Sequence, residues 1–311
     1  MEEEEDEIPQ EAKIAIAVVA FIILMENLLI CFVIYRHHYL RTFTNFFVAS
    51  LALSDILFAT VMVPANFLAP NEDVLNGFLI SIILLVNIGN ICAVTLDRYV
   101  AVLKPLVYTY IMERNFRKIL ALSWTIPIIF SMIPLCWRSD LTGKSQSIYL
   151  LCMLVIMIIT PYLFILLVYI RIFREVSKLE KNLTMLNRSY TLDSTSARKE
   201  EKRLSGEARV ARLFAIIAAI FILSWLPIIH MSTALALKRL DVIPKVLPVI
   251  SWFTLTLGNL MNAPLYALFK GDFRKALMKS FGLKKTNSNQ YLPSSHQEIA
   301  LSSQKTHVNE W

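Results

Sequence analysis

The chain has 311 residues, of which 56% are hydrophobic and only 18% are charged, and its mean hydropathy is +0.55. Because soluble domains carry about 25% charged residues, this composition excludes an ordinary soluble protein and indicates an integral membrane protein. The net charge of +7 comes from Lys and Arg between the apolar runs, where such residues orient membrane helices. It therefore gives no reason to expect a nucleic-acid partner.

Seven apolar segments have about the length of 20 helical residues that crosses the hydrocarbon core of a bilayer. We therefore predict an all-α fold, a seven-transmembrane helix bundle embedded in a lipid bilayer over residues 14–269. In chain order the segments are 14–35, 44–68, 74–96, 119–136, 148–170, 210–236 and 244–269.

The parts of the chain outside these segments differ in charge. Residues 1–13 are acidic, whereas basic residues follow the first, third, fifth and seventh segments, which predicts an N-terminus outside the cell. The charged, Ser- and Thr-rich residues 176–206 are predicted to form a cytoplasmic third loop whose ends extend the neighbouring helices. Residues 270–283 place apolar and basic side chains at helical spacing, which predicts a short amphipathic helix on the membrane surface. Residues 284–311 are predicted to be a disordered tail.

One carboxylate and several amides lie inside the predicted spans. An ionisable side chain at membrane depth, here Asp55 in the second span, suggests a functional site. Asn87 lies in the third span, and Asn259 and Asn262 lie three residues apart on one face of the seventh. These four side chains predict a sodium site, but a polar cluster that only holds helices together explains them equally well. Asp55 also leaves open an ion or proton transporter, although no internal repeat supports one.

A charged triplet, Asp97-Arg98-Tyr99, ends the third apolar segment. An Arg near the bilayer centre costs about 2.5 to 3.5 kcal/mol, so it is tolerated mainly at an edge or beside a partner. Asp97 is the first candidate partner of Arg98. In the sixth segment, Pro227 follows Trp225 by two residues and is expected to kink the helix.

Together these residues resemble the rhodopsin-like (class A) family of G-protein-coupled receptors over about residues 14–283. The motifs of the family occur in order, one in each predicted helix. They are Glu26-Asn27, Leu51-Ala52-Leu53-Ser54-Asp55, Asp97-Arg98-Tyr99, Trp124, Pro161 with Tyr169, Ser224-Trp225-Leu226-Pro227, and Asn262 with Tyr266.

The resemblance implies a plasma-membrane receptor, not an enzyme, that converts binding of an unidentified extracellular ligand into activation of a heterotrimeric G protein. Arrestin and receptor kinases are implied as further partners, and no cofactor is expected apart from an allosteric sodium ion. Arg98 is implied to pair with Asp97 and Glu207 in the resting state and to move towards Tyr169 and Tyr266 on activation.

Two further groups of residues are assigned by the resemblance alone. Pro161, Ile88 and Phe221 match the residues that transmit the signal beneath Trp225. Leu106 matches the residue of the second inner loop that docks, together with Arg98, against the G-protein α subunit.

The ligand cavity of such a bundle would be lined by residues from the outer halves of the helices. Their apolar character suits a lipid-like or other hydrophobic ligand, although ordinary helix packing also produces apolar interior faces. These residues are Ile80, Ser81, Leu84, Met153, Met157, Trp225, Ile228, Ile229, Ser232, Trp252 and Thr256.

Individual positions favour some ligands over others. Glu26 and the segment 161–173 most resemble the branch that contains melanocortin, lysophospholipid, cannabinoid and adenosine receptors. Ile80 occupies the position at which aminergic receptors carry an acid, which disfavours a biogenic amine. Thr256 replaces the retinal-binding lysine of opsins, which disfavours light sensing.

Two departures from the family pattern, at Asp73 and Pro264, leave open a receptor-like scaffold that does not signal. Asp73 stands where the family has its extracellular disulfide cysteine, and Cys136 and Cys152 flank a short outer loop without indicating whether they pair. Pro264 falls one residue later than in the family, which should rotate the kink by about 100° around the helix. The sequence names neither the ligand, nor the G-protein subtype, nor an oligomeric state.

Overall fold

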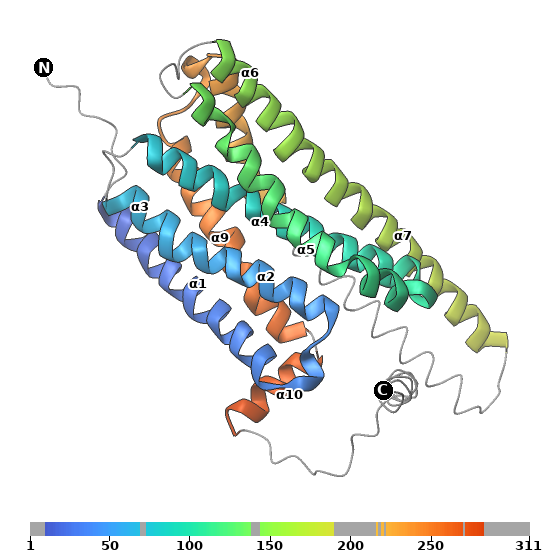
Figure 1. Ribbon diagram of the computed structural model, residues 1–311. Helices are drawn as coiled ribbons and strands as arrows, with labels where there is room; N and C mark the ends of the chain where they lie inside the picture. The colour runs from blue at the N-terminus through green and yellow to red at the C-terminus, as the bar shows by residue number, and fades with distance from the viewer. Residues whose placement is uncertain are drawn as a thin grey trace, which may run out of the picture.

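The computed structural model describes residues 10–68, 73–137, 144–189, 216, 219–220, 222–269 and 271–282, and these residues are helical apart from short connections. The α-helices form an elongated bundle, with α6 and α10 near opposite ends (Figure 1). They are α1 (Gln10–Arg36), α2 (Phe43–Leu57), α3 (Val63–Leu68), α4 (Asp73–Leu103), α5 (Tyr108–Met132), α6 (Lys144–Cys152), α7 (Thr160–Ser189), the helix Ile222–Ala236, α9 (Leu247–Phe269) and α10 (Gly271–Ser280).

The described helices give the seven spans of the prediction. Five stretches are long and apolar enough to cross a membrane, namely Gln10–Arg36, Phe43–Ala65, Gly77–Leu103, Pro105–Trp137 and Lys144–Lys178. Two of these join α-helices through single π-helical segments, Phe58–Met62 and Met153–Ile159. The shorter apolar helix Ile222–Ala236 and α9 correspond to the remaining two predicted spans, and residues 210–215, 217–218 and 221 of the sixth lie outside the described part of the chain.

Several helices are longer than the apolar pattern predicts. The predicted third span ends at residue 96 and the fourth begins at 119, whereas α4 runs to Leu103 and α5 begins at Tyr108. The predicted fifth span ends at residue 170, whereas α7 continues to Ser189, in line with the expectation that the ends of the loop 176–206 extend the neighbouring helices. Hydropathy marks only the part of a helix that crosses hydrocarbon, and a helix that continues into the polar region keeps its backbone hydrogen bonds.

The long helix α4 lies at the centre of the bundle and packs against α2, α5 and α7. The space for its contact with α5 is made by Gly89, where a Cβ atom would lie 2.4 Å from the backbone oxygen of Ser123. On the other side of the bundle, α1 packs against α2 and α9. Helices from distant parts of the sequence therefore meet along α4, which positions the polar residues described below.

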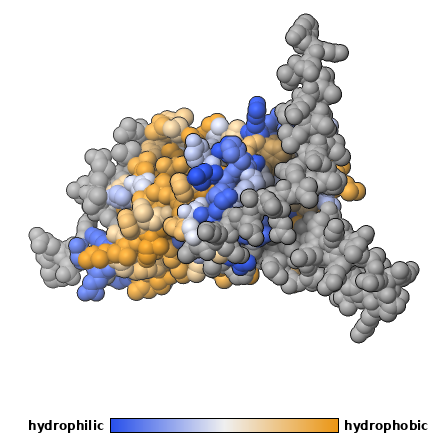
Figure 2. Space-filling model, turned by 90° about the horizontal axis from the view of Figure 1, so that it is seen from below, coloured by the Kyte–Doolittle hydropathy of each residue, from blue (hydrophilic) through white to orange (hydrophobic). Residues whose placement is uncertain are grey.

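The outer surfaces of the spans are apolar. Large hydrophobic side chains such as Ile14, Phe21, Phe32, Leu122 and Ile156 are exposed along them. In the view from below in Figure 2, hydrophobic residues cover much of the coloured surface, and a group of hydrophilic ones lies near its middle. An apolar surface of this extent is expected of a protein whose helices face lipid.

The end of the bundle at which α4 begins, which we call the Trp137 end, is held by aromatic side chains. Trp137 Nε1 donates a hydrogen bond of 2.8 Å to Gln146 Oε1. The ring of Tyr149 stacks on Phe130 with 5.7 Å between centroids, and Trp137 meets it edge-on at 6.0 Å. Cys136 and Cys152, whose pairing the sequence leaves open, are both free thiols and exposed.

At the other end, which we call the Arg98 end, α10 follows α9 and packs against both α1 and α9. Phe273 and Ala276 are buried on one side of α10, and Arg274, Lys275 and Lys279 are exposed. His37 Nε2 lies 2.9 Å from Ser280 Oγ, a contact that ties the turn after α1 to the end of α10. The helix therefore presents its basic side chains away from the bundle.

Candidate functional site

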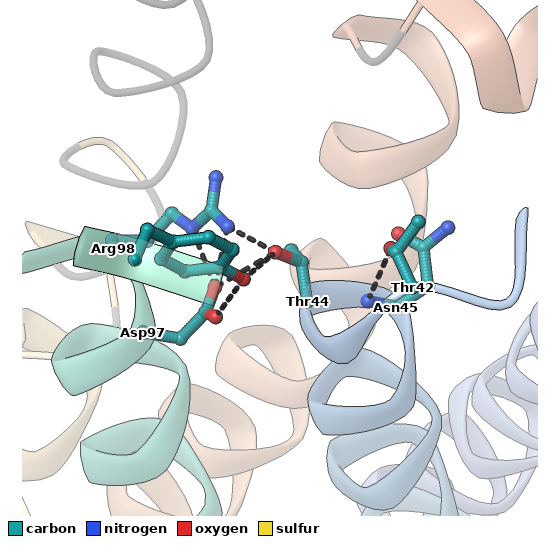
Figure 3. A network of polar contacts seen from close by, with 6 residues as sticks. Thr42, Thr44, Asn45, Asp97 and Arg98 are labelled. Carbon is teal, nitrogen blue, oxygen red and sulfur yellow. Dashed lines mark hydrogen bonds and ion pairs between the residues drawn. The ribbon is translucent and has the colours of Figure 1, made fainter. Parts of the chain in front are cut away.

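A network of polar contacts joins three helices at the Arg98 end (Figure 3). Its centre is the carboxylate of Asp97 on α4, which is 1% exposed. Thr44, in the first turn of α2, donates a hydrogen bond of 2.9 Å to Asp97 Oδ2. Tyr108, the first residue of α5, donates one of 2.7 Å to Asp97 Oδ1. Both carboxylate oxygens of Asp97 accept hydrogen bonds, and these bonds compensate for the loss of water around the buried charge.

Arg98 completes the network from the neighbouring position of α4. Its Nε donates to Asp97 Oδ2 at 2.9 Å, and its Nη2 contacts both Asp97 and the Thr44 hydroxyl. The Arg98 side chain is 11% exposed, so this pair is largely shielded from solvent. Hydrogen bonds between ionised groups are about twice as strong as neutral ones. The arrangement therefore ties the guanidinium to α4 and to the start of α2.

The helix starts that surround Asp97 explain how the network forms. Thr42 caps α2, and its side chain accepts a hydrogen bond of 3.3 Å from the backbone N–H of Asn45. This cap fixes the first turn of α2, which carries Thr44, at the level of Asp97. Sequence reasoning named Asp97 as the partner of Arg98 but missed Thr44 and Tyr108. The sequence marks these two residues only by their position, since each lies in the first turn of a helix at the Arg98 end.

The other predicted switch residues are only partly within the described side chains. Tyr99 is half-buried on α4 and Tyr169 is buried on α7. Leu106 lies in a short 3₁₀ turn, Pro105–Val107, and is 99% exposed. Glu207, Phe221 and the side chain of Tyr266 lie outside the described part, as does the side chain of Asp73. The pairing of Arg98 with Glu207 stays a prediction.

A second polar cluster lies in the middle of the bundle around Asp55, which is 0% exposed. Asn87 Nδ2 on α4 donates to Asp55 Oδ1 at 2.7 Å, and Asn262 Nδ2 on α9 donates to Asp55 Oδ2 at 3.1 Å. Asn87 Nδ2 also lies 3.2 Å from Asn259 Oδ1. The structure thus brings all four predicted residues together, and Ser54 Oγ joins them at 3.4 Å from the same nitrogen.

The oxygen atoms of this cluster fit a small monovalent cation better than a transition metal. They are carboxylate, amide and hydroxyl oxygens, which hard cations prefer. Within the described residues, no group of three or more His, Cys, Asp or Glu could hold a metal ion. Sodium binding at Asp55 stays a prediction, because the same hydrogen bonds also make a closed structural cluster.

The predicted transmission residues that the structure describes lie on α4, on α7 and in the helix Ile222–Ala236. Ile88 on α4 is buried, and Pro161 lies near the start of α7. Trp225 is buried in the helix Ile222–Ala236, beside Ser224. A Cβ atom on Gly258 would lie 2.6 Å from Ser224 Oγ, so α9 and this helix approach closely here. The absence of a side chain at Gly258 permits this contact.

The predicted ligand-lining residues occupy four helical segments but offer few polar groups. Leu84, Met157, Trp225 and Thr256 are buried. The hydroxyl of Thr256 donates to the backbone oxygen of Trp252 in its own helix at 2.6 Å. The remaining residues of the set are partly buried, namely Ile80, Ser81, Met153, Ile228, Ile229, Ser232 and Trp252. None of these side chains is charged, and any ligand they contact must bind mainly through apolar surface.

The geometry agrees with known proteins. A family model described as "7 transmembrane receptor (rhodopsin family)" matches residues 26–259. The structure resembles that of squid rhodopsin with a TM-score of 0.76, over 94% of this chain and 95% of the other, at 18% sequence identity. At that identity the likeness shows the fold, a seven-helix bundle, and nothing further.

Similar sequences include receptors for amines. The octopamine receptor beta-2R of Chilo suppressalis is 29% identical, with 85% of this chain and 78% of that protein covered. The D(5)-like dopamine receptor of Takifugu rubripes is 27% identical, and the match covers 84% of this chain but only 65% of the relative. These relatives lie in the biogenic-amine branch, whereas the sequence analysis expected the branch of melanocortin, lysophospholipid, cannabinoid and adenosine receptors.

Proposed function

The chain belongs to the rhodopsin family of seven-transmembrane receptors, and we propose that it converts binding of an extracellular ligand into activation of a heterotrimeric G protein. The observation that carries this proposal is the network at the Arg98 end. Asp97 and Arg98 are held there by Thr44 and Tyr108, and the next turn of the chain exposes Leu106. Membership of this receptor family also supports a G protein as the partner that binds the Arg98 end.

We place the receptor in the plasma membrane with its N-terminus outside, and we propose arrestin and receptor kinases as further partners. The exposed basic side chains of α10 at the Arg98 end support this orientation, because cytoplasmic flanks of membrane helices are enriched in Lys and Arg. A transporter that uses Asp55 has no support beyond that buried carboxylate, which the amides of Asn87 and Asn262 already satisfy.

For the ligand we propose a hydrophobic, lipid-like molecule that carries no cation at the level of Ile80. The apolar set around Leu84, Met157 and Trp225 supports this choice. A biogenic amine is the second candidate, because the similar proteins include octopamine and dopamine receptors. An ammonium group taken from water would need a carboxylate to pair with, and Ile80 offers none.

The proposal is tested by recording activation of each G-protein class in cells that express the chain. The ligand panel contains lysophospholipids, endocannabinoid-like lipids, adenosine, melanocortin peptides, octopamine and dopamine. We expect a response to a lipid-like ligand that disappears in Arg98→Ala at equal surface expression. Silence of the surface-expressed protein towards the whole panel, with no basal activity, would contradict signalling and favour a scaffold.

One substitution separates the two ligand classes. Ile80→Asp places a carboxylate at the position where aminergic receptors carry their acid, and Ser81→Asp places one at the next residue, about 100° away around the helix. If the pocket is otherwise suited to an amine, only Ile80→Asp gains a response to octopamine or dopamine. A response of the unmodified chain to either amine would overturn the lipid-like proposal.

A further inference from the structure

A cavity of 410 Å³ lies where α4, α5 and α7 meet, and Met157 is the one predicted ligand-lining residue in its lining. Its volume falls within the range of about 300 to 1,000 Å³ that small-molecule sites occupy. Both α5 and α7 pack against α4, whereas contacts between α5 and α7 are sparse among the described residues. The cavity is therefore a cleft with α4 as its floor and the other two helices as its walls.

The cleft is lined almost entirely by hydrocarbon. Ser123 carries the one hydroxyl in its lining, and this group donates a hydrogen bond of 2.8 Å to the backbone oxygen of Leu120. The thiol of Cys92 and the thioether sulfur of Met157 are the other heteroatoms on lining side chains, and no lining residue is charged. A ligand with unsatisfied polar groups would lose its hydrogen bonds with water here, so the lining selects an apolar occupant.

The mouth of the cleft opens sideways. Leu122 and Ile126 on α5 and Ile156 before α7 line it, and they are 52%, 49% and 52% exposed. All three lie within stretches long and apolar enough to span a membrane. The cleft is therefore entered from the lipid and not from water at either end of the bundle.

The position of the cleft along α4 matches one leaflet. Its floor runs from Leu85 to Leu96, twelve residues of helix whose first and last Cα atoms lie about 16 Å apart along the axis. This length is about half of the 30 Å thickness of the hydrocarbon core. Because Leu96 directly precedes Asp97, the cleft occupies the half of the membrane towards the Arg98 end. An acyl chain anchored by its headgroup at that surface would reach along this length.

We propose that the cleft binds one acyl chain of a phospholipid from the leaflet at the Arg98 end. The bound chain fills the space between α5 and α7 and packs against Ile88 and Pro161, which both line the cleft. Since these are two of the predicted transmission residues, the lipid contacts residues predicted to rearrange on activation, and it does so from the lipid-facing side of the bundle. The binding itself does not depend on the proposed signalling.

The test uses the whole chain in nanodiscs of phosphatidylcholine, a fraction of which carries a photoreactive diazirine in one acyl chain. After irradiation, we expect cross-links concentrated on residues 119–127 and 156–164. Leu122→Trp and Ile156→Trp each place an indole at the mouth, and we expect about tenfold fewer cross-links there. Both positions are exposed, so neither substitution disturbs the packed interior.

Matched controls lie on the same helical segments. Ile129 and Val155 are 66% and 46% exposed but do not line the cleft, so Ile129→Trp and Val155→Trp should cross-link as the unmodified chain does. In detergent, added phosphatidylcholine should raise the Tm of the unmodified chain and the controls, and should leave that of Leu122→Trp and Ile156→Trp unchanged.

Three results would overturn the proposal. They are cross-links spread equally over α1 and the cleft, cross-links at the cleft that persist in both mouth variants, and labelling of the cleft by a photoreactive sterol but not by phosphatidylcholine. The last would assign the cleft to a sterol. A receptor that cross-links as expected but activates no G protein would contradict the proposed function and leave the lipid site standing.

Discussion

The two ends of the bundle are held together by different forces. At the Arg98 end, one buried carboxylate collects donors from α2, α4 and α5. At the Trp137 end, contacts between aromatic rings and a hydrogen bond from Trp137 to Gln146 join the end of α5 to α6. A buried charge requires particular partners, whereas aromatic and apolar contacts accept many. The first end is therefore suited to a two-state switch and the second to variation among ligands.

The largest effect is expected at Asp97. Asp97→Ala removes the carboxylate that pairs with Arg98 and accepts the hydrogen bonds of Thr44 and Tyr108. Breaking a buried ion pair from one side costs about 3 to 5 kcal/mol, so the variant should show a strong loss of surface expression and thermal stability. Asp272→Ala on exposed α10 is the control. Equal stability of the two variants would contradict the central role of Asp97.

The next effect is expected at Asp55. Asp55→Ala leaves the amides of Asn87 and Asn262 buried without this acceptor, which should destabilise the protein by about 1 to 3 kcal/mol. If the cluster also binds sodium, the unmodified chain gains thermal stability when sodium replaces choline, and the variant does not. Stability of the unmodified chain that is the same in both salts would leave the cluster a structural one.

A smaller effect is expected at Tyr108. Tyr108→Phe keeps the ring and removes the hydroxyl that donates to Asp97 at 2.7 Å, at a cost of about 1.5 kcal/mol for a bond to a charged group. Tyr110→Phe removes a hydroxyl that is exposed and lies 3.4 Å from Arg114, so it should be silent. The comparison is made by thermal unfolding, and we also expect a changed basal signal only in Tyr108→Phe.

Substitutions at the Trp137 end should destabilise the protein less than substitutions at the Arg98 end. Trp137→Phe removes the hydrogen bond to Gln146 but keeps a ring beside Tyr149, and we expect a loss of about 0.5 kcal/mol. Thermal unfolding of this variant beside Tyr108→Phe measures the contrast between the two ends directly. A loss of stability in Trp137→Phe as large as that in Asp97→Ala would contradict the difference between the two ends.

The smallest effect is expected from pH at His37. Burial, then the charges of Lys279 and Arg36, lower the pKa of His37 below its ordinary value of 6.5. The folded state therefore favours the neutral ring, and the stability it contributes is present above pH 6.5 and is lost as the pH falls through the lowered pKa. The Tm of the unmodified chain should fall more between neutral pH and about pH 5 than that of His37→Gln.

Much of the fold, and the pairing of Arg98 with Asp97, could be predicted from the sequence. Apolar length gave the bundle, and the ordered motifs around Asp97-Arg98-Tyr99 gave the family. The ends of the helices could not be predicted in this way, because α4, α5 and α7 continue beyond the hydrocarbon, where hydropathy carries no signal. The same limit hid Thr44 and Tyr108, whose contacts with Asp97 join residues 53 and 11 positions apart.

The ligand branch was the weakest inference. Glu26 and the segment 161–173 indicated one branch, whereas the similar proteins found include octopamine and dopamine receptors. An apolar pocket wall has the same composition as a packed helix face, so residues such as Leu84 and Met157 do not distinguish ligands. The residue that does constrain the chemistry of the ligand is Ile80, because it places no acid at the position where aminergic receptors carry one.

Signalling through the Arg98 end is tested by nucleotide exchange on purified heterotrimeric G proteins, with the chain reconstituted in nanodiscs. We expect that the unmodified chain accelerates exchange on at least one G-protein class, that Arg98→Ala abolishes the acceleration, and that Leu106→Ala weakens it. No acceleration by a folded chain with any G protein or ligand, or acceleration that Arg98→Ala leaves unchanged, would contradict signalling through this end.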